Sequence, residues 1–193
     1  MIKVNKDTYL KWIIVCITTL GVGLFILFPF INMSSLTYSI ILNFTLMIWM
    51  SIVETLLIPK FNSAYFNCHS IEREGEIYKY FGVDYFRKFL VFIGWERSRK
   101  KETPIRKSLI LLEYYEYRTR CSEFGHGIIA IIIALITVYV FMVSSFKDII
   151  WLIILNIFLN IYPMMLQRYN RPRVRRLIKK LKLKQAKVIY RSW

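Results

Sequence analysis

Four long apolar runs constrain the fold of this chain more than any other feature of its sequence. They cover residues 12–31, 36–58, 127–143 and 149–167. A helix needs about 20 predominantly apolar residues to cross the hydrocarbon core of a bilayer. We therefore expect an all-α, polytopic membrane protein with about four transmembrane helices, built as a single integral membrane domain over residues 1–193.

The basic residues lie almost entirely outside these runs. The net charge is +16 although 56% of the residues are hydrophobic, and 27 of the 28 Lys and Arg residues fall in the N-terminal arm, the loop 59–126 and the tail 168–193. The two tight turns, 32–35 and 144–148, contain only Lys147. Because Lys and Arg are enriched on the cytoplasmic side of membrane proteins, we expect two hairpins in the cell membrane, with both termini and the loop in the cytoplasm.

Basic charge next to long apolar runs favours lipid headgroups over nucleic acid as the partner of this chain. The run 12–31 is longer than the core of an ordinary signal peptide, and no small-x-small cleavage site follows it, so we expect a retained span. The cysteines Cys16, Cys68 and Cys121 lie far apart, without a CxxC pair. We therefore expect no disulfide framework, no metal site and no bound cofactor.

The loop 59–126 is expected to be structured, because it is rich in aromatic residues. Its segment 81–95 has the pattern of an amphipathic piece that lies at the membrane interface. Thr103 and Pro104 favour the start of a helix that runs into the third span. After Pro172 the tail alternates apolar and basic residues, which is typical of an amphipathic helix on a membrane surface.

Polar residues inside the spans are candidates for function, because they are costly in a bilayer. Asn43 and Glu54 share a face of the second span, and Asn156, Asn160 and Gln167 share a face of the fourth. Hydrogen bonds that hold the bundle together are the alternative explanation for the asparagines. The carboxylate of Glu54 can also extend to the interface or pair with a basic residue.

The strongest catalytic pattern is Arg120-x-x-Glu123-x-x-His126, at the start of the third span. On a helix these residues are neighbours on one face. A carboxylate beside an imidazole can orient the ring and raise its basicity, as a general base requires. The alternative is a helix-surface ion pair with a neutral capping histidine. We expect Gly125 and Gly127 to loosen the backbone around His126.

The junction between the fourth run and the tail carries a specific pattern of mixed residue types, Asn160-x-x-Pro163-x-x-x-Gln167-Arg168-Tyr169-Asn170-Arg171-Pro172-Arg173. With the Arg-x-x-Glu-x-x-His pattern, it resembles the glycosyl-4,4'-diaponeurosporenoate acyltransferase family, small membrane enzymes of carotenoid pigment biosynthesis. A looser match is Glu72-x-x-Gly75-x-x-Tyr78, and the resemblance covers roughly residues 59–184. It implies a small helical membrane bundle that moves a fatty acyl group to a sugar hydroxyl of a glycosylated carotenoid or a related glycolipid.

The resemblance also suggests roles for these residues. His126 would be the base, oriented by Glu123, which Arg120 would hold. Arginine forks suit phosphate, so the tail arginines could bind an acyl thioester of CoA or of a carrier protein. Asn170 or Gln167 could hydrogen-bond the sugar or the developing oxyanion. The full set of expected substrate-binding residues is Glu54, Asn160, Gln167, Arg168, Tyr169, Asn170, Arg171 and Arg173.

Two alternatives remain open at this point. A basic four-span protein can bind anionic lipid or scaffold a membrane complex without being an enzyme. A small membrane methyltransferase also places Arg, Pro and His near the end of a late span. The spacing of His69 and Glu74 matches an acyltransferase His-x4-Asp motif, but with Glu in place of Asp.

Overall fold

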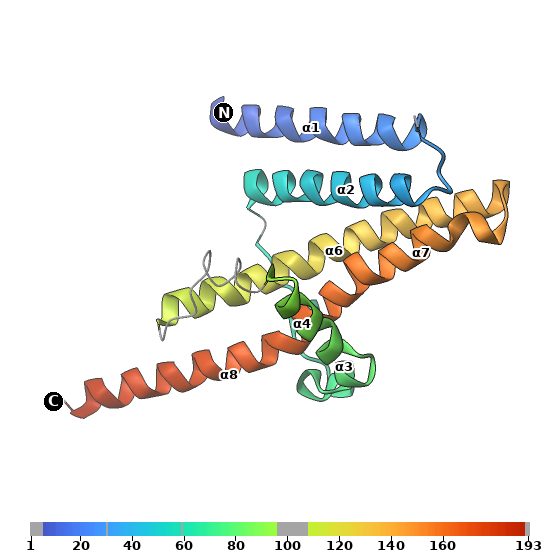
Figure 1. Ribbon diagram of the computed structural model, residues 1–193. Coiled ribbons are helices and arrows are strands. Elements are labelled where there is room, and N and C mark those ends of the chain that lie inside the picture. The colour runs from blue at the N-terminus through green and yellow to red at the C-terminus, as the bar shows by residue number, and fades with distance from the viewer. Residues whose placement is uncertain (1–5, 30, 59, 96–107, 192–193) are drawn as a thin grey trace. The chain divides into compact units, whose positions relative to one another are not determined.

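The computed structural model describes residues 6–29, 31–58, 60–95 and 108–191, and within these ranges the chain forms helices and no strand (Figure 1). The expected helix start at Thr103 and Pro104 lies outside the described residues. The chain divides into two compact units. We call Met1–Lys60 with Phe124–Ile161 the span unit, and Phe61–Glu123 with Tyr162–Trp193 the loop unit.

The first hairpin joins α1 (Lys6–Leu27) to α2 (Leu36–Leu57). The helix α1 begins six residues before the predicted start and ends before Pro29, because the residue that precedes a proline is disfavoured in the helical region. At the start of α2, the Ser35 hydroxyl accepts the Tyr38 N–H at 3.0 Å. This cap satisfies a backbone donor that the first turn leaves without a partner.

The second hairpin joins α6 (Leu109–Val143) to α7 (Ile150–Asn156) through the short helix η3 (Phe146–Ile149). The predicted third span is thus the second half of a longer helix. The looser backbone expected around Gly125 and Gly127 is wrong, because α6 is helical throughout.

The fourth apolar run ends inside a helical stretch rather than at Gln167. After α7 come one π-helical turn, η4 (Ile157–Ile161), and then α8 (Tyr162–Arg191). The predicted amphipathic tail therefore belongs to a helix that already begins at Tyr162 and continues through Pro172.

Among the residues that the structure describes, four helical stretches are long and apolar enough to cross a membrane, namely Asp7–Leu27, Leu36–Leu57, Leu109–Val143 and Phe146–Lys187. The prediction of an all-α, multi-pass membrane protein with four spans is confirmed. Which side of the membrane the termini face stays a prediction, because length and composition alone do not determine orientation.

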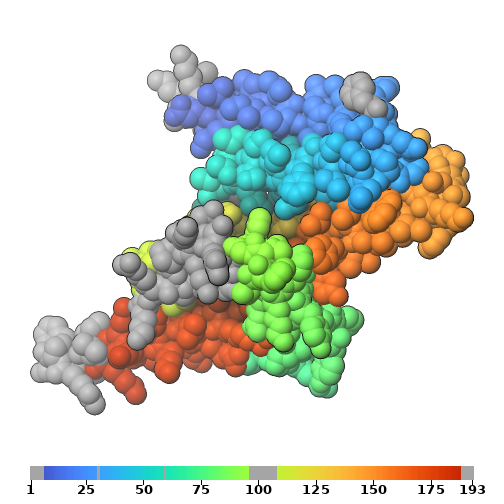
Figure 2. Space-filling model, viewed as in Figure 1, coloured from blue at the N-terminus to red at the C-terminus, as the bar shows by residue number. Residues whose placement is uncertain are grey.

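The core of the span unit is built by α2, α6 and α7. Its buried side chains are Tyr38, Leu42, Leu46, Met50, Ile129, Ile133, Ile136, Val140, Ile149 and Leu152. The helix α1 lies along α2 (Figure 2), and the Trp49 indole N–H donates to the Thr19 hydroxyl at 3.0 Å. Side chains such as Ile17 and Leu20 are about two-thirds exposed on α1, as expected for a helix surface that faces lipid.

In the loop unit, α3 (Ile77–Tyr80) and α4 (Val83–Phe92) pack against α8. The buried face of α4 and its contacts on α8 consist of Val83, Phe86, Leu166 and Tyr169. The other face of α4 exposes aromatic rings, including Tyr85 at 77% and Phe92 at 87%. The predicted amphipathic character of this segment is confirmed, and its location at a membrane interface stays a prediction.

A close backbone contact fixes the loop unit at Gly75, the last residue of η2 (Ser70–Gly75). Gly75 has φ +89°, and a Cβ on it would lie 3.1 Å from the Cα and carbonyl oxygen of Tyr169 and 3.2 Å from the Arg168 carbonyl oxygen. Pro172 has no N–H, so it cannot pair with that Arg168 carbonyl as a helical residue four positions later normally does. Only glycine permits both this φ and this approach.

Candidate active site

A buried carboxylate between two arginines is the centre of the polar cluster in the loop unit. Glu123 of α6 has a fully buried side chain, and its two oxygens pair with different residues of α8. Arg168 Nε donates to Oε1 at 2.7 Å, and Arg171 Nη2 donates to Oε2. Two guanidinium groups on one carboxylate compensate for the cost of removing these charges from water.

Arg171 is held by four donated hydrogen bonds. Besides Glu123, its guanidinium donates to the Thr119 hydroxyl at 3.0 Å, the Thr119 carbonyl at 3.1 Å and the Phe66 carbonyl at 3.2 Å. The guanidinium also lies 5.4 Å from the centre of the Phe66 ring. With its side chain only 4% exposed, Arg171 acts as a fixed connection between α8, α6 and the loop.

Arg168 connects the same carboxylate to Glu72, with which it forms a second ion pair. Its Nη2 donates to the Tyr65 carbonyl at 2.9 Å. Glu72 also accepts the Tyr78 hydroxyl at 2.6 Å and the His69 backbone N–H at 2.9 Å. Burial by itself would raise the pKa of Glu72, but these hydrogen bonds and the Arg168 charge outweigh burial and lower it.

Arg120 pairs with Glu116, one turn earlier on α6, at 2.7 Å. It also donates to the Phe61 carbonyl. Arg120 thus attaches the start of the loop to α6, whereas Glu123 has Arg168 and Arg171 as its ion-pair partners. A catalytic role for Arg120 stays a prediction.

Two further predicted residues of α8 have structural contacts. Arg173 pairs with Glu76 at 2.7 Å and lies 3.7 Å from the centre of the Tyr169 ring. Tyr169 is buried, and its hydroxyl donates to Asp84 at 3.1 Å. For Gln167 and Asn170 the structure gives no hydrogen-bond partner among the described residues, and their contact with a substrate stays a prediction.

A second polar cluster lies in the span unit and centres on Asn160, a fully buried residue of the π-helical turn η4. Its Nδ2 donates to Asn43 Oδ1 at 2.8 Å and to Asn156 Oδ1 at 3.1 Å. Its Oδ1 lies 3.4 Å from His126 Nδ1. The network therefore joins α2, α6, α7 and η4 within the apolar bundle.

The directions of these hydrogen bonds determine the tautomer of His126. Asn43 Nδ2 donates to the Ser39 carbonyl at 2.8 Å, and Asn156 Nδ2 donates to the Ala130 carbonyl at 3.1 Å. Both NH2 hydrogens of Asn160 are then used, and its Oδ1 is left as an acceptor for an N–H. His126 therefore donates from Nδ1 to this oxygen, and in the neutral form of the ring the lone pair is on Nε2.

Glu54 of α2 lies against α6 at Gly125, the residue before His126. A Cβ on Gly125 would fall 2.7 Å from Glu54 Oε1 and 3.1 Å from Met50 Cγ. The absence of a side chain at Gly125 thus lets a carboxylate approach the helix that carries the imidazole. A contact of Glu54 with a substrate stays a prediction.

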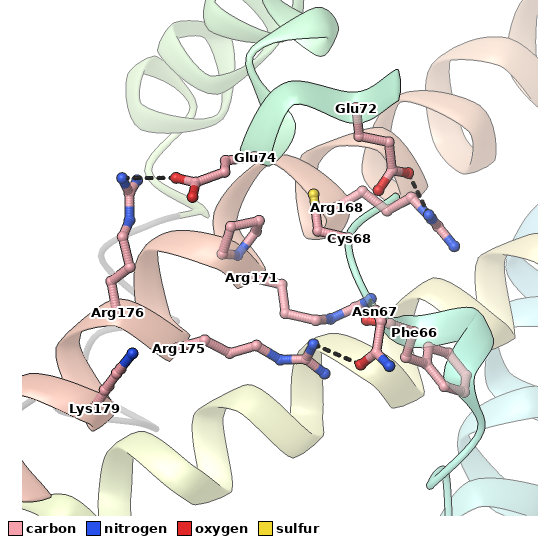
Figure 3. Close-up of a pocket in the computed structure, with 11 residues that line it drawn as sticks. Phe66, Asn67, Cys68, Glu72, Glu74, Arg168, Arg171, Arg175, Arg176 and Lys179 are labelled. Carbon is pink, nitrogen blue, oxygen red and sulfur yellow. Dashed lines mark hydrogen bonds and ion pairs between the residues drawn. The ribbon is translucent and has the colours of Figure 1, made fainter. Parts of the chain in front are cut away.

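The loop unit contains a cavity of about 250 Å³ beside α8 (Figure 3). Basic side chains of α8 line it, together with residues of the loop that precedes α3. Among the described residues, no group of three His, Cys, Asp or Glu side chains could hold a metal ion.

Sequence reasoning identified Glu123, His126, Asn160, Arg168 and Arg171, which the structure places in the two polar clusters. It missed partners of Arg168 and Arg171 that lie far away in the chain, namely Tyr65, Phe66, Glu72 and Thr119, and it also missed Glu116 as the partner of Arg120. Glu72 was present in the motif that carried the resemblance, and an i,i+4 search would have paired Glu116 with Arg120. Backbone carbonyl acceptors leave no sequence signal.

The fold and the clusters define a multi-pass membrane protein whose span unit carries a histidine–asparagine network and whose loop unit contains a cavity lined by basic side chains. Residues 62–180 match the model of a known family, described as glycosyl-4,4'-diaponeurosporenoate acyltransferase. This match covers more than half of the chain, so the chain belongs to that family and is an acyltransferase of carotenoid biosynthesis. Comparisons with curated proteins and with solved structures gave no match.

Proposed function

We propose that this enzyme transfers a fatty acyl group from an activated donor to a sugar hydroxyl of a glycosylated carotenoid or related glycolipid in the cell membrane. The family match supports this reaction class, and it includes His126, Asn160 and the arginines of α8. The four apolar helices support a lipid acceptor, because a glycosylated carotenoid would be dissolved in the bilayer that surrounds them.

The observation that carries the proposal is the contact between His126 and Asn160. A hydroxyl is a weak nucleophile and needs a base within hydrogen-bonding reach. With a proton on Nδ1 of the neutral ring, Nε2 is the atom whose lone pair can take the sugar proton. A neutral imidazole inside an apolar bundle is also ready to accept a proton without first losing one.

The sugar O–H proton moves to His126 Nε2 while the oxygen attacks the acyl carbonyl carbon. The tetrahedral intermediate collapses, the bond from the acyl carbon to the leaving sulfur of a thioester donor breaks, and the thiolate takes the proton back from the imidazolium. The products are the sugar ester and a free thiol, and His126 returns to its neutral form.

In this proposal the main role of Glu123 is to stabilise the loop unit. Its two oxygens hold Arg168 and Arg171, which in turn fix the loop carbonyls of Tyr65 and Phe66. We place the termini and the loop unit in the cytoplasm, where acyl thioesters are made. The excess of Lys and Arg in these segments supports this orientation.

Deletion of the gene in a host that makes glycosylated carotenoid tests the reaction. Mass spectrometry of total lipid should show loss of an ester whose mass equals the glycoside plus one fatty acyl group, and accumulation of the free glycoside. Complementation with the wild type or with His69→Ala should restore the ester, and His126→Ala should not. An unchanged lipid profile in the deletion strain contradicts the proposal and favours an anionic-lipid binder or a methyltransferase.

A further inference from the structure

The cavity of the loop unit has an inner and an outer group of cations (Figure 3). The inner pair, Arg168 and Arg171, is largely buried and occupied by carboxylates and backbone carbonyls. The outer group, Arg175, Arg176 and Lys179, lies further along α8. The two groups differ in how many of their donors remain available, and this difference decides which of them can bind a ligand.

Two of the outer cations, Arg176 and Lys179, have few and weak partners, whereas Arg175 forms an ion pair with the largely buried Glu116. Within the part of the chain that the structure describes, Arg176 has one ion pair, with Glu74 at 2.9 Å, and the two side chains are 59% and 64% exposed. An exposed ion pair of this kind contributes little to stability, and its two members separate easily. Lys179 is exposed and has no ion pair with a described residue. Arg175 donates to Glu116 at 2.8 Å and to Asn67 at 3.0 Å, which holds its guanidinium at the cavity wall.

A small dianion matches this arrangement. Arginine forks and a lysine at close spacing suit the oxygens of a phosphate group. The thiol of Cys68 adds no opposing charge, because burial and the neighbouring Glu72 carboxylate raise its pKa. Glu72, the deeper of the two carboxylates at the cavity, is already paired with Arg168.

The size of the cavity limits the ligand further. Pockets that enclose a drug-sized ligand measure about 300 to 1,000 Å³, and this cavity measures about 250 Å³. It has room for a phosphate or a diphosphate group, while the remainder of the ligand must lie outside. It is too small for a carotenoid or a fatty acyl chain.

We propose that Arg176 and Lys179, next to the Arg175 guanidinium at the cavity wall, bind a phosphate monoester or diphosphate group, and that this group belongs to the acyl donor. The assignment to the donor rests on the proposed function. Arg168 and Arg171, which the sequence suggested for this role, instead form the fixed wall of the cavity, because their charges are already neutralised by Glu72 and Glu123.

The test measures binding by calorimetry on the full-length protein in phosphatidylcholine nanodiscs. The probes are CoA, pyrophosphate and pantetheine, which lacks phosphate. The variant R176Q/K179Q removes two outer cations, and K180Q/K184Q removes two exposed cations of α8 that do not line the cavity. We expect R176Q/K179Q to weaken CoA and pyrophosphate binding about tenfold or more, K180Q/K184Q to change it less than about twofold, and pantetheine not to bind.

Equal weakening by the two double variants would overturn the proposal, because it would mean that only the general positive charge matters. Pantetheine binding as tight as CoA binding would also overturn it. Addition of phosphatidylglycerol to the nanodiscs separates the two sources of phosphate. If it competes with CoA in the wild type but not in R176Q/K179Q, the site binds phosphate, and the assignment to a thioester donor falls.

Binding and catalysis can fail separately. His126→Ala should bind CoA like the wild type, even though it should not form the ester. If the wild type forms no ester with any thioester but binds CoA through Arg176 and Lys179, the phosphate site stands and the proposed function falls. If ester forms normally in R176Q/K179Q at low donor concentration, the phosphate site falls and the proposed function stands.

Discussion

Glu123 and Arg171 form an ion pair in which both side chains are almost completely buried, with exposures of 0% and 4%. They lie 48 residues apart in the chain, on α6 and α8. A buried pair of this kind connects two helices of the loop unit, and its two members depend on each other, because neither charge can reach water alone.

Removal of one member should therefore be costly. We expect Glu123→Gln to destabilise the folded protein by about 3 to 5 kcal/mol, because it leaves buried guanidinium charge without its carboxylate. Glu74→Gln breaks the exposed pair with Arg176 and should cost less than about 1 kcal/mol. Thermal unfolding in detergent compares the two variants. Equal unfolding midpoints would show that the buried Glu123 pair contributes no more to stability than the exposed pair.

The contact of Gly75 with α8 allows the cost of backbone strain to be distinguished from the cost of a steric clash. Gly75→Ala meets both a strained φ of +89° and a backbone contact at 3.1 Å, whereas Gly94→Ala meets a φ of +80° with no atom within 4 Å. Strain alone costs about 1 kcal/mol or more. We expect Gly75→Ala to lower the unfolding midpoint clearly more than Gly94→Ala, with Gly21→Ala, which has neither problem, nearly unchanged. An effect at Gly75 no larger than at Gly94 would argue against close packing on Tyr169.

The lowered pKa of Glu72 predicts how stability depends on pH. A carboxylate whose pKa is lower in the folded than in the unfolded state stabilises the fold above its ordinary value of 4.5. That contribution is lost as the pH falls through the lower, folded-state pKa. Glu72→Gln should therefore be less stable than the wild type at pH 7, and the difference should shrink below pH 4.5. A stability difference that stays constant from pH 7 to pH 3 would contradict the Glu72 contacts.

The asparagine network predicts a separation between stability and activity. Asn160→Leu removes the partners of Asn43, Asn156 and His126, and should cost about 1 kcal/mol of stability, as polar contacts inside membrane bundles do. It should also lower the rate of ester formation, because the ring of His126 loses its orientation. Asn156→Leu leaves the contact between His126 and Asn160 intact. It should reduce stability similarly but keep most of the activity, and an equal loss of activity would refute the orienting role.

The parts of the fold that sequence predicted are those that depend on local periodicity. The apolar runs predicted the four spans, and the aromatic pattern predicted the amphipathic α4. The π-helical turn at Asn160 was not predicted, because a shift in the hydrogen-bond register of a helix has no signature in composition. That turn holds the asparagine which contacts His126.

The candidate site divides in the same way. Residue types and helical spacing identified Glu123, His126 and Arg168 as candidates. Local spacing, however, suggested Arg120 as the partner of Glu123, whereas the observed partners come from α8, 45 and 48 positions away. Contacts over such separations depend on how helices pack, and a single sequence does not contain that information.

In the proposed reaction His126 accepts the proton of the sugar hydroxyl, and this role can be measured. It is tested most directly by the initial rate of ester formation in membrane vesicles that contain equal amounts of folded wild type, His126→Ala or His69→Ala, supplied with glycosylated carotenoid and an acyl thioester. Removal of a general base lowers a rate about 10²- to 10⁴-fold. We expect a loss of this size for His126→Ala and a near wild-type rate for His69→Ala. A His126→Ala enzyme that forms the ester within about twofold of the wild-type rate would contradict it.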